Sequence, residues 1–304
     1  MDNSETIGPK TENLKAYLLL VLTTICWAMN AVLGRFAVGE VSPIALVSLR
    51  WFGVVLLLSL FAFKYVREDW MILRKHLLYF FCMGALGFTG FNMLFYLAAH
   101  STTAVNIGIL QGSIPVFVLL GAFLALKTRV TPLQMVGVAF TVSGVIIVGA
   151  GGSLEQLANF EFNRGDVMML GACALYAGYT VTLRDRPKVS ALAFFALMAI
   201  AAFLTSVPFV LIEISLGQFQ APTTTGWIVI AIVVLFPSFI AQIAFIKGVG
   251  ILGPGRAGVF VNLVPIFAAI MAVTFLDEPF KFYHGVALGL VLFGIWLSER
   301  GKPA

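Results

Sequence analysis

Ten apolar stretches follow one another along the chain, separated by shorter polar segments. At 1.5 Å rise per residue, a helix of about 20 residues spans the hydrocarbon core of a bilayer. Only the connections at 64–75 and 151–165 are long, and neither can hold a soluble domain. The pattern therefore predicts membrane-spanning helices near 14–38, 42–65, 76–99, 102–126, 131–150, 166–184, 190–214, 225–248, 253–276 and 281–298.

The chain also repeats itself at a separation of 150 residues. The corresponding pairs are Gly108 and Gly258, Pro115 and Pro265, Phe117 and Phe267, Leu126 and Leu276, and Gly144 and Gly294. Because each half holds an odd number of spans, the second copy must start from the opposite side of the membrane. We expect an all-α integral membrane protein of two inverted five-helix repeats, at 14–150 and 166–298, joined by a loop at 151–165. Polar tails are expected at 1–13 and 299–304.

Composition agrees with a membrane protein. Apolar residues make up 60% of the chain and charged residues 11%, against roughly 25% charged in soluble domains. The net charge of +5 does not indicate a nucleic-acid partner, because the basic residues stand at the edges of apolar runs. The three cysteines lie far apart inside apolar segments, so the sequence predicts neither a disulfide framework nor a metal site. No cofactor is expected.

The basic residues predict the orientation. If the N-terminus is cytoplasmic, fourteen of the 19 Lys and Arg residues fall on the inner side, and only Arg35, Arg164 and Lys281 fall outside. Arg50 and Arg256 then lie within helices. Since Lys and Arg concentrate in cytoplasmic loops, both termini are expected in the cytoplasm.

Several segments resemble the drug/metabolite transporter superfamily, in its ten-helix EamA-type branch. CWAMNAVLGRFA (26–37) and VSPIALVSLRW (41–51) resemble the first two helices, and the resemblance returns at 96–126, 131–148, 254–280 and 285–296. The acidic residue that usually follows the fourth helix is replaced by Thr128, whereas its second-half counterpart is present as Glu278. Within the superfamily, the chain is most similar to bacterial inner-membrane exporters of aromatic amino acids, which are also associated with methyl viologen efflux. The resemblance implies amino-acid export with broad side-chain tolerance.

Polar and aromatic residues far from helix ends are candidates for the substrate site, because an amide in hydrocarbon is costly unless it faces protein or a water-filled cavity. An interhelical hydrogen bond is the alternative role for each amide, and core packing or interfacial anchoring for each aromatic residue. Trp27 and Tyr176 occupy matching positions of the two halves at a separation of 149, as a site on a pseudo-twofold axis requires. The candidates are Trp27, Asn30, Asn92, Tyr96, Asn106, Gln111, Tyr176, Tyr179, Gln242 and Asn262.

Three charged residues have gating or structural interpretations. Arg50 matches an arginine that the family places in the second helix; it is predicted to brace the first helix, with pairing to Glu40 or a place near a substrate carboxylate as alternatives. Arg256, just inside the ninth helix, is predicted to snorkel outwards. Glu278, with Asp277, is predicted to be a solvated charge at a helix end, or else a gate contact with Lys281 or His284.

Proline and glycine indicate the moving parts. Pro115 and Pro265 lie midway along the fourth and ninth helices, where each removes a backbone donor and favours a kink. Glycines concentrate in the third, fourth, eighth and ninth helices, which together with the first and sixth are predicted to enclose the pathway. The fifth and tenth helices hold few polar residues and are expected at the periphery, or alternatively at a homodimer interface.

The sequence favours facilitated export over ion coupling. Every acidic residue lies near a helix end or in a loop, so no buried acid is expected at membrane depth. A cationic drug or nucleotide-sugar carrier would keep the fold and change the pocket. An ion channel is disfavoured because no carboxylate ring or filter sequence is present, and an intramembrane enzyme because no HExxH pair or partnered nucleophile can be assembled.

Overall fold

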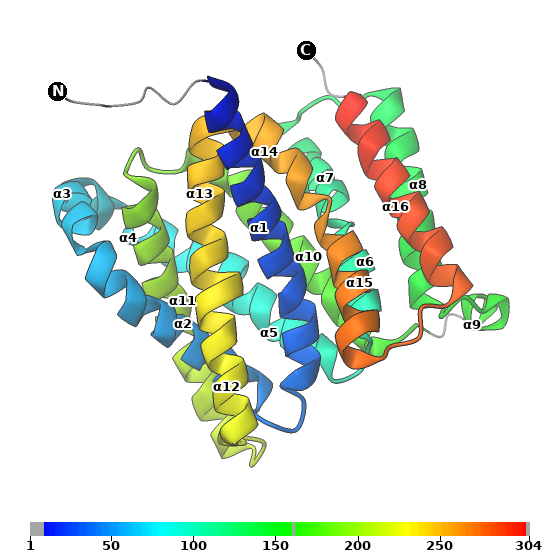
Figure 1. Ribbon diagram of the computed structural model, residues 1–304, viewed down its shortest axis with the longest axis horizontal. Coiled ribbons are helices and arrows are strands. Elements are labelled where there is room, and N and C mark those ends of the chain that lie inside the picture. Colours follow the sequence, from blue (N-terminus) through cyan, green and yellow to red (C-terminus); the bar gives the residue numbers. More distant parts are fainter. Residues whose placement is uncertain (1–8, 160–161, 302–304) are drawn as a thin grey trace.

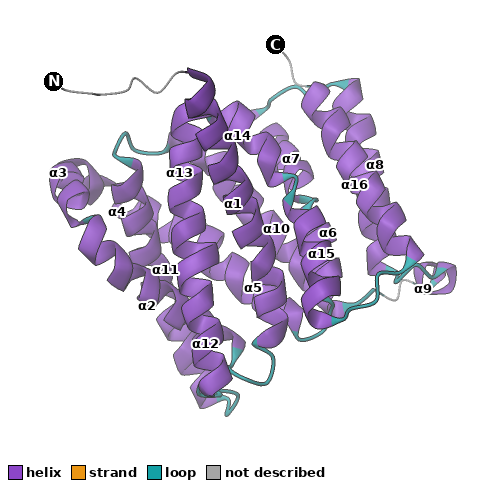
Figure 2. Cartoon of the chain, in the orientation of Figure 1, coloured by secondary structure: helices purple, strands orange, loops and turns teal. Residues whose placement is uncertain are grey.

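The computed structural model describes residues 9–159 and 162–301, which form helices and connecting loops without a strand (Figures 1 and 2). The first half comprises α1 (Pro9–Phe36), α2 (Pro43–Phe61), α3 (Phe63–Leu73), η1 (Arg74–His76), α4 (Leu77–Met83), η2 (Gly84–Gly90), α5 (Phe91–Ala99), α6 (Ala104–Gln111), α7 (Ile114–Leu126) and α8 (Pro132–Gly149). After α9 (Leu154–Ala158), the second half comprises α10 (Arg164–Thr182), η3 (Leu183–Asp185), α11 (Ala191–Ser215), α12 (Thr224–Val233), η4 (Val234–Ile240), α13 (Ala241–Leu252), α14 (Pro254–Val261), α15 (Val264–Leu276) and α16 (Phe282–Arg300).

These elements combine into 10 helices that are long and apolar enough to cross a membrane, so the predicted fold class is confirmed. Each predicted span has its counterpart, from Glu12–Phe36 to Phe282–Arg300. Figure 1 shows that α1 and α10, the first spans of the two halves, run in opposite directions through the bundle, as an inverted repeat requires.

Backbone irregularities recur at the same separation as the sequence repeat. The third span contains the π-helical segment η2 and the eighth contains η4, each opening the helical hydrogen-bond ladder by one residue. The fourth and ninth spans both break before a proline, since Pro115 and Pro265 stand in the first turn of α7 and α15. The predicted interruptions at the two prolines are therefore confirmed.

Two predicted boundaries are wrong. Residues 64–75, predicted as a connection, form α3 and η1, because charged side chains keep a segment out of the bilayer core without opposing helix formation. Lys64 and Glu68 pair one turn apart in α3, and Asp69 accepts a hydrogen bond from the Ser190 backbone N–H before α11. Residues 9–13 of the predicted tail belong to α1, which begins at Pro9, a residue suited to a first helical position; residues 1–8 lie outside the described part.

Helices α8 and α16 pack against each other at one edge of the bundle, which confirms their predicted peripheral position (Figure 1). Repeat-related glycines make the close approach. A Cβ on Gly144 would lie 2.7 Å from the Ala287 carbonyl oxygen, and one on Gly294 would clash with the Gly137 carbonyl oxygen. The two backbones therefore approach more closely than any larger residue allows.

Replacing Gly294 by Ala is expected to lower the thermal stability of the detergent-solubilised protein. The added methyl group meets a backbone carbonyl that no rotamer change can move, and overpacking of this kind costs about 1–3 kcal/mol. Gly289→Ala on the same helix is the matched control, because a Cβ there meets nothing within 4 Å. Equal melting temperatures for the two variants would contradict the close packing of α8 on α16.

Candidate functional site

A polar network is buried where α1, α2 and α5 meet. Arg50 Nη1 donates hydrogen bonds to Asn30 Oδ1 (3.2 Å), Asn92 Oδ1 (2.6 Å) and the Tyr96 hydroxyl (2.8 Å). Tyr96 in turn donates to Asn30 Oδ1 (2.8 Å), and Asn92 Nδ2 donates to the Phe88 carbonyl. Arg50 and Asn30 are each 6% exposed, and Asn92 and Tyr96 less so. Three candidate residues of the sequence thus meet around one guanidinium.

The contacts of Arg50 distinguish among its predicted roles. Its bond to Asn30 joins α2 to the first helix, in agreement with the bracing role. The alternative pairing with Glu40 is wrong, because the Glu40 carboxylate accepts a hydrogen bond from Thr223 and forms no ion pair with Arg50. The prediction of the enclosing helices had left out α2, which supplies the central charge of this network.

Aromatic rings extend from the network to α10. Trp51 stacks on Phe88 with centroids 4.6 Å apart, Phe88 contacts Tyr179, and Tyr179 contacts Tyr176. Phe91, Phe95 and Tyr96 complete the series on the α5 side. Two more candidates, Tyr176 and Tyr179, therefore share an aromatic wall with the Arg50 network.

The remaining central candidates do not join this cluster. Trp27 packs against Phe245 of α13, with centroids 5.1 Å apart, and has no described ring contact with Tyr176. Gln111 ends α6 and leaves its buried Nε2 without a partner, while Gln242 in α13 and Asn262 at the α14–α15 break are half-buried. The matching sequence positions of Trp27 and Tyr176 therefore do not place the two rings in contact.

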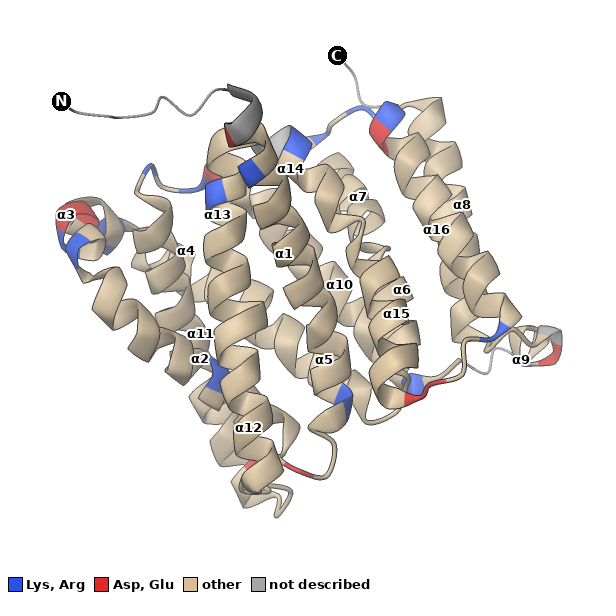
Figure 3. Ribbon diagram, viewed as in Figure 1, with Lys and Arg blue, Asp and Glu red and all other residues tan. Residues whose placement is uncertain are grey.

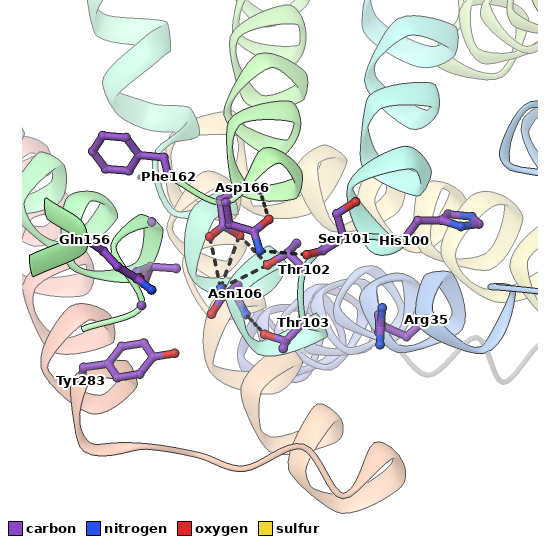
Figure 4. Close-up of a pocket in the computed structure, with 14 residues that line it drawn as sticks. Arg35, His100, Ser101, Thr102, Thr103, Asn106, Gln156, Phe162, Asp166 and Tyr283 are labelled. Carbon is purple, nitrogen blue, oxygen red and sulfur yellow. Dashed lines mark hydrogen bonds between the residues drawn. The ribbon is translucent and has the colours of Figure 1, made fainter. Parts of the chain in front are cut away.

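A cavity of about 560 Å³ lies between the α5–α6 connection, the start of α10 and the start of α16 (Figure 4). These segments are at the end of the bundle opposite the two termini (Figure 1). In its wall, Asp166 accepts hydrogen bonds from Thr102 Oγ1 (2.5 Å) and Asn106 Nδ2 (3.3 Å to each oxygen). The buried Asn106 Oδ1 has no partner. Asn106, predicted as a central binding residue, therefore belongs to this end cavity instead.

The expectation of no buried acid is wrong. Asp166 is 2% exposed and Glu213 4%. Glu213 accepts hydrogen bonds from Ser42 Oγ (2.7 Å) and the Ile44 backbone N–H (3.3 Å). Both acids stand near helix ends, where the sequence suggests solvent, but neighbouring loops fold over them. Asn163, three residues before Asp166, is the N-cap of α10. Asparagine is a preferred N-cap residue, so this sequence signal could have predicted that Asp166 lies in the first turn of a helix.

Glu278 joins the second half of the chain to the first half next to the cavity. Its carboxylate accepts hydrogen bonds from the backbone N–H groups of Ala104 (2.9 Å) and Val105 (3.0 Å) at the start of α6, and Arg35 Nε lies 3.7 Å away. An acid at a helix N-terminus is stabilised by the free N–H groups and the helix dipole. Both predicted roles of Glu278 are therefore wrong: it is largely buried, and its partners belong to the first half rather than to Lys281 or His284.

Among the described residues, the second half has no equivalent of this contact. The N-cap of α14 is Gly253, which has no side-chain cap, and Thr128 stands where a repeat-related acid would be. Arg256 in the first turn of α14 is exposed, as predicted.

In the cavity wall on the Arg35 side, partial burial and the nearby Arg35 lower the pKa of His100, so its imidazole is uncharged at neutral pH.

Repeat-matched half-helices are packed unequally. All residues of α6 from Ala104 to Leu110 are buried, and α6 packs directly on α15, where a Cβ on Gly108 would lie 2.5 Å from Ala268 Cβ. At the end near the termini, α7 has no buried residue, and Ala257 is the one buried residue among the described side chains of α14. A Cβ on Gly258 would meet nothing within 4 Å. The bundle is therefore tight at the cavity end and loose at the end of the termini.

Ten spans with repeat-related half-helices at their centre define a multi-pass membrane protein with the architecture of carriers. The profile of the EamA-like transporter family matches residues 14–150 and again residues 163–300, so the chain belongs to this family of membrane transporters. The resemblance to the EamA-type branch is confirmed, and each match covers one predicted repeat.

Relatives and a solved structure agree with this assignment. The chain is 25% identical over 297 residues to YetK of Bacillus subtilis, described as an uncharacterized transporter, covering 96% of this chain and 88% of that protein. It is 23% identical over 282 residues to YedA of Escherichia coli K12, described as an uncharacterized inner membrane transporter, covering 91% and 88%. A crystal structure at 17% identity superposes with a TM-score of 0.61 over 93% of this chain and 95% of the other, which supports the fold.

Proposed function

We propose that this protein exports amino acids, aromatic ones with broad tolerance, by alternating access. The unequal packing of the repeat-matched half-helices is the observation that carries the proposal. At present α6 packs on α15. If α14 packed on α7 in the same way while α6 and α15 separated, the tight end and the loose end of the bundle would exchange. Such an exchange between two halves is the motion by which inverted-repeat carriers expose one site to either side.

The direction of transport follows from the distribution of charge. Lys and Arg gather at the end of the bundle where both termini lie (Figure 3). Cytoplasmic loops are the basic ones, so we place both termini in the cytoplasm. The arrangement described above is then closed to the outside and accessible from the cytoplasm. The description of YedA as an inner membrane transporter supports the same bacterial membrane for this chain.

Energy coupling needs its own test. The sequence argument for facilitated export was the lack of a buried acid, and Asp166 and Glu213 remove that argument. Both carboxylates are nevertheless held by hydroxyl, amide or backbone donors near the ends of helices, and neither contacts the Arg50 network. We therefore keep facilitated export as the proposal and include an imposed pH gradient in the experiment.

Uptake of labelled Phe, Trp, Thr and Lys into proteoliposomes tests the proposal. Saturable uptake of Phe and Trp without a pH gradient is expected, and unlabelled Phe should compete. Empty liposomes control for leakage. Movement of methyl viologen with none of the amino acids would replace the proposal by cationic drug efflux, and a strict requirement for the gradient would refute the facilitated mechanism. Ion conductance that does not saturate would indicate a channel, and chemical conversion of the substrate an enzyme.

A further inference from the structure

We propose that Arg50 is the receptor for the carboxylate of the substrate, held in position by Asn30, Asn92 and Tyr96. The inference rests on the proposed export of amino acids and names the chemical group that the central network recognises. Two independent features of the described residues carry it: hydrogen-bond donors without acceptors, and a buried positive charge without a counter-ion.

The donors of the guanidinium are only partly used. Arginine has five N–H donors in a fixed plane, and the hydrogen bonds of Arg50 to described residues all start from Nη1. Nε is buried without a partner. No described residue accepts a hydrogen bond from the edge formed by Nε and Nη2, and this edge matches the two oxygens of a carboxylate in a bidentate pair.

A second unpaired donor lies on the same helix. The indole Nε1 of Trp51 is buried and has no partner. The centroid of the Trp51 ring lies 5.2 Å from Arg50 Cζ, so this donor is close to the guanidinium. Buried N–H groups in native proteins are normally paired, and each one left unpaired costs about 1–3 kcal/mol. Two adjacent residues with surplus donors make the region suited to an acceptor-rich anion.

The charge of Arg50 is also unbalanced. Arginine stays protonated in proteins, and its acceptors here are two amide oxygens and a phenol, all neutral. The ion pairs among the described residues are Arg35–Glu278 and Lys64–Glu68, so Arg50 has no carboxylate within 4 Å. A buried charge without a counter-ion is unfavourable even when neutral groups accept its hydrogen bonds. Bracing of the helices needs only Nη1, whereas an arriving carboxylate would neutralise the charge and fill the free edge.

The surroundings also fit an aromatic amino acid over a cation. Trp51 stacks on Phe88, which leads to Tyr179 and Tyr176 on α10, so an aromatic wall adjoins the guanidinium. A dicationic substrate such as methyl viologen would be repelled by Arg50 at this place. The positive charge of Arg50 therefore favours substrates with a carboxylate, such as aromatic amino acids, over cationic substrates.

Competition between analogues tests the inference. Uptake of labelled Phe into proteoliposomes is measured with Phe, 3-phenylpropanoate, phenylalaninamide and 2-phenylethylamine as competitors. Phe and 3-phenylpropanoate are expected to compete, whereas the two compounds without a carboxylate should not. Arg50→Gln is expected to lower kcat/KM for Phe on the order of 100-fold and to abolish the preference for carboxylates. Arg50→Lys should restore part of that preference, because lysine keeps the charge and loses the planar fork.

Arg129→Gln is the matched control, since it removes the same charge from an exposed loop position and should change nothing. If Arg50→Gln does not fold, ligand-induced stabilisation of the wild-type protein in detergent decides the question: Phe and 3-phenylpropanoate should raise its melting temperature and phenylalaninamide should not. Equal responses to Phe and phenylalaninamide, or an unchanged preference in Arg50→Gln, would overturn the inference.

The two proposals fail separately. Transport of Phe and phenylalaninamide at equal rates would leave amino-acid export standing and remove the role of Arg50. Stabilisation of the wild-type protein by 3-phenylpropanoate, weakened in Arg50→Lys and absent in Arg50→Gln, with no uptake of any amino acid would leave the carboxylate receptor standing and remove amino-acid export.

Discussion

Alanine at Gly108 and alanine at Gly258 are expected to bias the protein towards opposite conformations, although the two glycines occupy equivalent positions of the repeat. At Gly108 the added Cβ would lie 2.5 Å from Ala268 Cβ, and both atoms are fixed to backbones, so α6 and α15 must separate. At Gly258 the Cβ meets nothing, and alanine there gains about 1 kcal/mol of helix propensity. Exchange of the packings would bring Gly258 against Val118, the repeat counterpart of Ala268.

Thiol labelling measures this bias. Leu110, fully buried in α6, is replaced by Cys in a variant without the three native cysteines, and an impermeant reagent is added at the cavity end. A penalty of about 1–3 kcal/mol predicts labelling about 10-fold faster in Gly108→Ala and slower in Gly258→Ala. Transport should fall in both variants, because the cycle visits both states. Labelling that changes in the same direction in both would contradict the pseudo-symmetric exchange.

Replacing Glu278 by Gln is expected to open the cavity end. The carboxylate makes two hydrogen bonds to the N-terminus of α6 and lies beside Arg35, and loss of its charge costs about 2 kcal/mol. That value corresponds to about 30-fold in the balance between closed and open states. The Leu110→Cys reporter should therefore label about 30-fold faster when the reagent is added at the cavity end.

Two further variants test whether the contact of Glu278 with the N-terminus of α6 keeps the cavity end closed. Asp277→Asn removes the neighbouring exposed charge and should not change labelling, since Asn tolerates the left-handed conformation that Asp277 adopts (φ 52°). Thr128→Glu places an acid at the repeat counterpart of Glu278 and should also speed labelling, because it would latch the N-terminus of α14 in the exchanged state. Faster labelling in Asp277→Asn would show that loss of any charge here opens the end.

The candidate site was only partly predictable. Asn30, Asn92 and Tyr96 were singled out because polar groups at membrane depth need partners, and the structure brings them to Arg50. Their pairing could not be read from the chain, since it depends on the rotation of three helices about their axes. Asn106 met the same sequence criterion and lies in the end cavity, because it stands in the first turn of α6 rather than midway along an unbroken helix.

The missed residues have a common cause. Asp166, Glu213 and Glu278 all stand near helix ends, where sequence position suggests solvent, yet each is buried or nearly so by a segment distant in sequence. Helix α3 was not predicted for a different reason: its charges exclude a membrane span, and an apolar pattern does not indicate helices outside the bilayer core.

The sequence alone determined the ten spans, the repeat of 150 residues, the proline breaks and the family, because span length, apolar pattern and proline chemistry act locally along the chain. Only the tertiary structure decided which end is tightly packed, which acids are buried, and that Nε of Arg50 has no partner. These properties depend on contacts between residues 20 to 174 positions apart, such as Arg50 with Asn30 and Glu278 with Ala104. Such contacts exist only once the helices have packed.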